Sequence, residues 1–333
     1  MGGVLVTHAD QPLGRRIVKL LWHDAATSRI VALGEGPAPR AFDRFRIGAQ
    51  PRLVYEQLDH ARQRSVADLF RSRRLRELDI HAVVYVPRHG TSPAGPPVVA
   101  RVPARTAEAR LFLHQALEHR SVRSLVALGS AFVYKLAPGN ANHLAEDSPL
   151  DLDPAVPAAL RTWIDSDMLF QAETSGRRLR VALLRLPTVV ASGGYVYLHP
   201  LLEGAGGPRL CPLGFDPLCP VVADKDVAHA VLATLASRAS GVFNVAGREL
   251  VPLSVLGRWT GHALLPMPGP LLRFAGRSAA RLGLGEAFDG PLLRFGMSLD
   301  TRRAAAELGF APRYRIGLAR AGDGALRLEA VAA

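Results

Sequence analysis

Short apolar runs alternate with longer segments of helical spacing along the first half of the chain. The runs, which predict β-strands, lie at residues 4–7, 29–33, 53–58, 81–86, 124–129 and 179–186. Apolar residues recur at helical spacing in segments 13–22, 65–78, 104–119 and 158–174. Strands that alternate with helices predict a parallel sheet, because each crossover between parallel strands needs a helix that covers one face. We therefore expect an α/β fold built on a doubly wound parallel sheet.

The second half has a different pattern and predicts a smaller mixed lobe. Residues 193–220 are rich in Gly and Pro and have little periodicity, which predicts a long loop at the mouth of a site. A strand is expected at 241–245, and helices are expected at 224–237, 251–259, 270–282 and 299–308. We expect one domain over residues 1–190 and a C-terminal lobe over 191–333, with the chain passing between the two.

Composition narrows the class of protein. The chain has 333 residues, of which 48% are hydrophobic, so it can bury a full-size core. We find no charge-free apolar run of about 18 residues and no signal-peptide layout, so we expect neither a membrane span nor export. Cys211 and Cys219 are then expected to be free thiols of a cytoplasmic protein.

The net charge of +12 comes almost entirely from arginine, since three of the 41 basic residues are lysines. The densest arginine cluster, residues 62–76, lies on a predicted helix and is interleaved with apolar residues, which indicates a solvated helix face. The chain carries no helix-turn-helix, zinc or RNA-binding signature. We therefore do not expect nucleic acid as a partner.

Seven strings of residues occur in a fixed order between residues 3 and 320. They are VLVTHADQPLGRRIVKLL, ALGSAFVYK, LAEDSPLD, RVALLRLPTVV, KDVAHAVLATL, GVFNVAG and LDTRRAAAELGFAPRY. Together they resemble the extended short-chain dehydrogenase/reductase family, the NAD-dependent epimerase/dehydratase branch. The resemblance implies a Rossmann-like, NAD(P)-binding-type domain and a substrate-type C-terminal lobe.

The first turn departs from the family's T-G-x-x-G-x-x-G pattern. Thr7 and Gly14 are kept, Leu13 precedes Gly14, and His8 and Gln11 stand where the family has the two glycines nearest the pyrophosphate. Those glycines let backbone N–H groups approach the phosphates at a helix N-terminus. We expect a side chain at Gln11 to enter the space of the pyrophosphate.

Charges near this turn leave two interpretations open. Asp10 adds negative charge where phosphate would lie, which favours an ordinary strand–turn–helix connection. The helix dipole, with Arg15 and Arg16, could instead still hold an anion.

Two further cofactor positions of the family are altered. Gly34 occupies the position of the acidic residue that binds the adenosine ribose in the family. Glu35 could bind the ribose instead, by a shift of one residue, or it could be a solvated loop charge. Pro87 and Arg88 replace small residues after the fourth strand, and they change the floor of the groove.

The family's catalytic dyad is missing. The resemblance aligns Trp163 with the catalytic tyrosine and Asp167 with the lysine four residues later, and Ser130 alone survives from the catalytic set. That lysine normally lowers the pKa of the tyrosine, whereas an aspartate would raise it. None of the six tyrosines is followed four residues later by Lys or Arg, so no other register restores the dyad.

No metal site is expected, because the histidines show no ligand spacing with cysteine or paired acids. The histidines considered are His8, His60, His89, His114, His119 and His143.

We interpret the chain as a catalytically degenerate protein with a non-redox binding, scaffolding or regulatory role. Two alternatives stay open. One is a divergent NAD(P)-dependent oxidoreductase or epimerase that uses His8, Asp167 and Ser130; the other is a non-redox catalyst in the same pocket. We expect no cofactor, or NAD or NADP if binding is retained. Partners expected are a small molecule, a protein, or a second copy that pairs through helices 104–119 and 158–174, as in the family.

Overall fold

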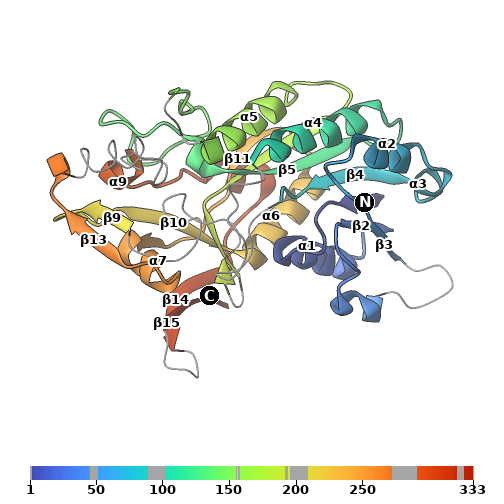
Figure 1. The fold of residues 1–333 in the computed structure, drawn as a ribbon. Coiled ribbons are helices and arrows are strands. Elements are labelled where there is room, and N and C mark those ends of the chain that lie inside the picture. The colour runs from blue at the N-terminus through green and yellow to red at the C-terminus, as the bar shows by residue number, and fades with distance from the viewer. Residues whose placement is uncertain are drawn as a thin grey trace.

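A seven-stranded parallel sheet forms the centre of the molecule (Figure 1). The computed structural model describes residues 2–45, 52–88, 102–154, 156, 158–191, 194–195, 209–271, 291–320 and 326–332. The strand order is β11-β6-β5-β4-β1-β2-β3, and every neighbouring pair is parallel. The predicted α/β, Rossmann-like doubly wound fold is therefore confirmed.

The strands of this sheet are almost continuous apolar runs, because helices cover both of its faces. The side chains of β1, β2 and β5 are buried along the whole strand. The strands are β1 (Gly3–Val6), β2 (Ile30–Gly34), β3 (Leu53–Gln57), β4 (Ile80–Tyr85), β5 (Ser124–Ser130), β6 (Arg180–Leu186) and β11 (Gly241–Asn244). Strand β11 comes from the second half of the chain, so that half completes the first sheet.

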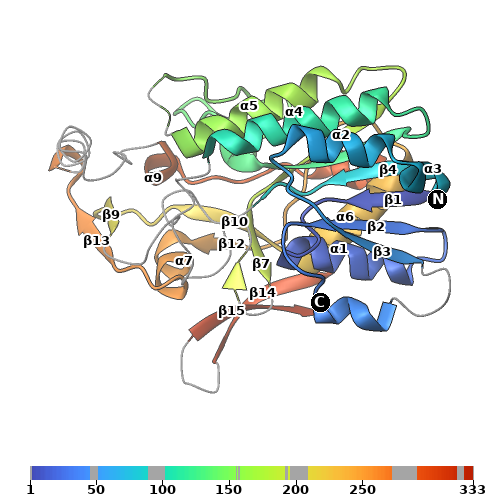
Figure 2. The ribbon, with the colours of Figure 1, turned by 45° about the vertical axis from the view of Figure 1, so that its right-hand side comes forward.

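Two helical layers sandwich the sheet (Figure 2). One layer holds α2 (Gln63–Arg71), α3 (Arg73–Glu77), α4 (Val102–Glu118) and α5 (Ala158–Ala172). The other holds α1 (Pro12–His23), α6 (Asp224–Ser237) and α10 (Arg302–Leu308).

The single helix predicted over 65–78 is wrong, because the structure divides it at Ser72. This residue has an extended backbone, and its hydroxyl accepts a hydrogen bond from the Leu75 backbone N–H at 3.1 Å. Serine is a favoured N-cap, so it ends α2 and begins α3.

Smaller sheets make up the rest of the second half. One sheet joins β12, β10, β7 and β8, while β13 pairs with β9 and β14 pairs with β15. The strands are β7 (Thr188–Ala191), β8 (Gly194–Tyr195), β9 (Arg209–Pro212), β10 (Leu218–Ala223), β12 (Leu250–Pro252), β13 (Leu264–Met267), β14 (Tyr314–Arg320) and β15 (Leu326–Ala332). Two short helices, α7 (Leu253–Trp259) and α9 (Pro291–Phe295), belong to this half, while η1 (Arg40–Phe45) and η3 (Ala131–Val133) lie in the first half of the chain.

Two predictions for this half need correction. The expected loop 193–220 contains β8, β9 and the first half of β10, and β10 buries Cys219 and Val221 in a third core cluster. After the last predicted helix, strands β14 and β15 pair antiparallel and bury Ile316 and Leu328 in the same cluster. The helix expected at 251–259 begins at Leu253, after β12, and the one expected at 270–282 lies mostly outside the described residues.

Within the described residues, no helix is both long enough and apolar enough to cross a membrane. Helices α4 and α5, proposed above as a dimer face, pack against each other, and Phe112, Leu113 and Phe170 are buried in the core of the chain itself. A dimer through this face stays a prediction, and it would use the outward side chains of the two helices.

The turn between β1 and α1 is held by two close contacts. The Thr7 hydroxyl donates to the Val86 carbonyl at 2.9 Å and accepts from the Val86 backbone N–H at 2.8 Å, which fixes the end of β1 to the end of β4. A Cβ on Gly14 would collide with the His8 carbonyl oxygen and lie 2.8 Å from Ala9 Cα. Glycine is therefore required where α1 meets the turn.

We predict that Gly14→Ala lowers the free energy of unfolding by about 1–3 kcal/mol, because the added methyl group meets backbone atoms that cannot move aside. Chemical denaturation measures the change. Gly139→Ala is the matched control, since a Cβ there has no neighbour within 4 Å among the described residues, and it should leave the stability nearly unchanged. Equal stability of the two variants would contradict the close approach of α1.

Candidate functional site

His8 lies at the first glycine position of the cofactor turn and keeps a glycine-like backbone. Its φ is 45°, in the left-handed region that few side chains other than Asn, Asp and His adopt. The side chain is fully buried, and Nε2 donates to Glu108 Oε1 of α4 at 2.7 Å. The ring stacks on His60 with centroids 4.1 Å apart. A left-handed backbone is thus combined with a buried imidazole at this turn.

Asp10 occupies the backbone donors that follow β2. Its Oδ2 accepts hydrogen bonds from the N–H groups of Glu35 at 3.1 Å and Gly36 at 3.0 Å. A Cβ on Gly34 would meet the Tyr55 hydroxyl and lie 2.9 Å from Asp10 Cβ, which explains why no acidic side chain stands at Gly34. Burial, together with the charge of Asp10, raises the pKa of Tyr55 to about 12.

Glu35, Arg88 and His60 form a second group at the same edge of the sheet. The Glu35 carboxylate forms an ion pair with Arg88 through Oε2, and its Oε1 lies 3.9 Å from His60 Nδ1. Arg105 of α4 donates to the Arg88 carbonyl at 3.3 Å. Burial is the largest cause that lowers the pKa of His60 to about 2, followed by the charges of His8 and Arg88, so this imidazole is neutral.

The structure thus brings together three residues that the sequence analysis treated separately. His8 follows β1, Glu35 follows β2 and His60 follows β3, and these three strands are neighbours. Linear spacing between the residues carries no ligand signal. The signal that could have found them is their shared position, since the carboxyl ends of neighbouring parallel strands meet at one edge of a sheet.

Asp167, at the position of the family's lysine, forms a buried ion pair with Arg185 of β6. Arg185 donates to the two carboxylate oxygens of Asp167 at 2.8 and 2.7 Å, and both side chains are fully buried. Arg185 also donates to the Glu146 carbonyl at 2.9 Å and lies over the Tyr134 ring. Burial raises the pKa of Asp167, and the bonds to Asp167 raise the pKa of Arg185 and keep it charged. The Asp167 carboxylate is therefore held in an ion pair with Arg185 inside the fold.

The other two positions of the catalytic set have local roles. The Trp163 ring is largely buried beneath the Arg105 guanidinium, 4.0 Å from its centroid. The Ser130 hydroxyl accepts from the Phe132 backbone N–H at 3.2 Å and caps η3. This contact is the ordinary use of a serine at the end of a strand.

The remaining turn residues also serve the fold. Leu13 is fully buried, and Gln11 is the N-cap residue of α1. Arg16 Nε donates to Asp224 Oδ2 at 2.9 Å, which ties this arginine to α6 instead of leaving it for an anion.

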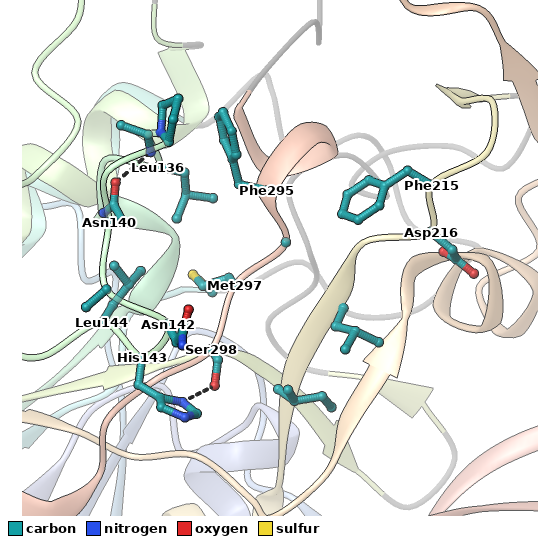
Figure 3. A pocket seen from close by; sticks show the side chains of 16 residues that line it. Leu136, Asn140, Asn142, His143, Leu144, Phe215, Asp216, Phe295, Met297 and Ser298 are labelled. Atoms are coloured by element: carbon teal, nitrogen blue, oxygen red, sulfur yellow. Dashed lines mark hydrogen bonds between the residues drawn. The ribbon is translucent and has the colours of Figure 1, made fainter.

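A separate pocket of about 440 Å³ lies between the segment after η3 and the second half of the chain (Figure 3). Leu136 and Asn140 line one wall and Phe215 lines the opposite one, while Phe295 comes from α9. His143 Nδ1 lies 2.7 Å from the Ser298 hydroxyl, in hydrogen-bond contact. Apolar walls with a few polar groups are typical of small-molecule sites.

Comparisons with known proteins place this geometry in a fold group. The sequence matches no family model and no curated protein. Similar solved structures include UDP-glucuronic acid 4-epimerase from Bacillus cereus in complex with UDP-glucuronic acid and NAD, at 14% identity and a TM-score of 0.63, covering 93% of this chain and 94% of that one. DesIV, the dTDP-glucose 4,6-dehydratase from Streptomyces venezuelae with NAD bound, matches at 18% identity and a TM-score of 0.63, covering 97% and 94%.

A third similar structure is dTDP-glucose 4,6-dehydratase from Bacillus anthracis in complex with NAD, at 12% identity and a TM-score of 0.62, covering 94% of this chain and 92% of that one. Likenesses at such low identity establish the fold. The chain therefore has the fold of the extended short-chain dehydrogenase/reductases.

We predict that Asp167→Ala lowers the free energy of unfolding by about 3–5 kcal/mol, because it leaves the Arg185 charge buried without a counter-ion. The double variant Asp167→Leu with Arg185→Met removes both charges and should recover most of this loss. Chemical denaturation measures the free energies of unfolding of the single and the double variant.

Glu77→Ala is the control for this comparison, since it breaks the exposed Arg73–Glu77 ion pair and should change the stability by less than about 1 kcal/mol. An Asp167→Ala protein as stable as the control would contradict the buried pair.

Proposed function

We propose that this protein is a catalytically degenerate relative of the NAD-dependent epimerases and dehydratases, with a binding or regulatory role in place of hydride transfer. One observation carries the proposal: side chains of the chain itself fill and pair with one another at the positions where the family holds its dinucleotide. Fold alone does not decide function, so the argument rests on these positions.

At the pyrophosphate and ribose end, the residues present do not fit a dinucleotide. The buried His8 side chain, bonded to Glu108, stands beside the turn that the family leaves to glycine. Asp10 engages two backbone N–H groups after β2, and it adds a negative charge near a polyanionic ligand. Glu35, the remaining candidate for the ribose, is paired with Arg88.

At the nicotinamide end, the lysine that would bind the ribose is replaced by Asp167, and its charge is neutralised by Arg185. Trp163 carries an indole N–H, which cannot shuttle a proton as a phenol does. These residues supply no acid–base pair for hydride transfer. Ser130, which caps η3, is the one hydroxyl left from the set.

A binding role fits the pocket of Figure 3 better than it fits the cofactor groove. This pocket combines the apolar Leu136, Phe215 and Met297 with polar side chains, among them His143 and the acidic Asp216. A small molecule with both apolar and polar parts suits such walls. No residue of the seven-stranded central sheet lines this pocket, whereas Leu218 and Leu250 come from β10 and β12 of a smaller sheet. The pocket can therefore hold a ligand independently of the cofactor groove.

We predict that NAD and NADP bind with dissociation constants near 1 mM or weaker. Three family contacts are altered, and if each costs about 1.5 kcal/mol the total of about 4–5 kcal/mol turns a micromolar site into a millimolar one. Isothermal titration calorimetry with each nucleotide at millimolar concentration measures this. A dissociation constant below about 50 μM would instead favour the divergent oxidoreductase or epimerase.

We predict that restoring the dyad residues by Trp163→Tyr with Asp167→Lys produces no turnover. The new lysine would lie beside the buried Arg185 without a counter-ion, so the double variant should also lose about 3–5 kcal/mol of stability. Conversion of UDP-glucuronic acid and dTDP-glucose in the presence of NAD is followed by chromatography of the sugar nucleotides, because such reactions regenerate their NAD and leave no net NADH, and stability is followed by chemical denaturation. Turnover by a stable double variant would show that the groove accepts a cofactor.

A further inference from the structure

Two buried imidazoles lack the hydrogen bonds that buried polar groups normally make. Among the described residues, neither ring nitrogen of His60 has a hydrogen-bond partner, and Nδ1 of His8 has none. Both side chains are fully buried. A buried polar group without a partner is destabilising, and in native proteins such a group is commonly satisfied by an ion or a bound water molecule.

The third member of the cluster supplies a carboxylate. One potential ligand atom from each of His8, Glu35 and His60 lies within 4.8 Å of the other two. In a tetrahedral zinc site with bonds of about 2.0–2.2 Å, neighbouring ligand atoms lie about 3.4 Å apart. Closing the set takes shifts of about 1.5 Å together with a rotation of the two stacked rings, so that a lone pair of each points at the ion. Glu35 presents Oε1 toward His60 while Oε2 pairs with Arg88.

A carboxylate behind His8 completes the arrangement. His8 Nε2 donates to Glu108 Oε1 at 2.7 Å, since an ionised carboxylate can only accept. Metal-binding histidines nearly always donate their second ring nitrogen to a carboxylate, a carbonyl or a water, which fixes the tautomer and orients the ring. His8 with Glu108 has this arrangement, and its unpartnered Nδ1 keeps a lone pair.

We propose that His8, His60 and Glu35 form a Zn²⁺ site at the carboxyl ends of β1, β2 and β3, with Glu108 orienting His8. Two imidazoles and one carboxylate are a ligand set that zinc uses when a fourth position is left for water or another ligand. The Glu35 side chain is 24% exposed and marks the side from which the ion would enter. The two negative charges of Glu35 and Glu108 balance the double positive charge of the ion, and Arg88 adds one further positive charge nearby.

This site does not depend on the proposed loss of hydride transfer. A chain that binds Zn²⁺ here could still fail or succeed in binding a nucleotide, and the two measurements are separate. The fold relatives use this edge of the sheet for phosphate, whereas the buried imidazoles and the carboxylate suit a cation.

The test uses the full chain, freed of metal with a chelator and then titrated with Zn²⁺ by isothermal titration calorimetry. We expect one ion per chain, and a rise in melting temperature on adding Zn²⁺. Co²⁺ serves as a spectroscopic probe, and tetrahedral absorption bands without a thiolate-to-metal band would assign the ion to nitrogen and oxygen ligands and exclude Cys211 and Cys219. A thiolate band, or saturable binding weaker than about 100 μM, would overturn the proposal.

Three variants locate the ion. His8→Asn keeps a residue that tolerates the left-handed backbone, and His60→Phe keeps an aromatic ring beside His8 and Phe112. Each should weaken Zn²⁺ binding by at least about 100-fold, and Glu108→Gln should weaken it by about 10-fold by loosening the orientation of His8. His114→Ala is the control, because His114 is an exposed histidine outside both sites, and it should bind Zn²⁺ as the unmodified chain does.

Folding failure cannot mimic this outcome. His60→Phe removes a buried imidazole that lacks partners, so its metal-free form should be at least as stable as the metal-free parent. Addition of Zn²⁺ should nevertheless not raise the melting temperature of this variant. Binding that survives both His8→Asn and His60→Phe would place the ion elsewhere and overturn the site.

Discussion

The parallel arrangement of β1, β2, β3 and β4 is the constraint on which the rest of this site depends. Parallel strands end at the same edge, so whatever follows each strand meets at one place. In this chain the residues that follow them are His8, Glu35, His60 and Arg88, and their side chains contact one another. Solved structures with this fold hold NAD, and ligands of such sheets lie at this edge. In this chain the same edge is occupied by side chains that pair with one another.

A charged or strained residue in the interior of the fold needs neighbouring groups that offset its energetic cost. A lone Asp167 in the interior would be strongly unfavourable, and its bidentate pairing with Arg185 removes that penalty. His8 in a left-handed conformation is likewise supported by Glu108 and by the His60 ring, and Gly14 leaves room for its carbonyl. These side chains stabilise one another, as native contacts in a stably folded protein generally do.

Sequence reasoning found the sheet because its signal is local. Apolar runs and helical periodicity place β1 to β6 within one or two residues, whereas β9, β10 and the β14–β15 hairpin lie in Gly- and Pro-containing segments whose burial is set by distant contacts with the third core cluster. The identities of Trp163 and Asp167 could be read from the sequence. Their partners could not, because Arg185 lies 18 residues from Asp167 and nothing in linear spacing connects the two.

The same limit applies to His8 and His60, and it bears on how degenerate sites should be interpreted. Absence of a motif indicates what a pocket has lost, while the contacts made by the replacing side chains indicate what it has gained. Here the replacement of the first glycine by His8 removes room for phosphate and adds a ring nitrogen beside Glu35 and His60. A phosphate site needs exposed backbone donors, and a cation site needs lone pairs in a buried setting. Because one small volume cannot satisfy both requirements, the substitutions that argue against a dinucleotide at this edge are the ones that argue for a metal ion there.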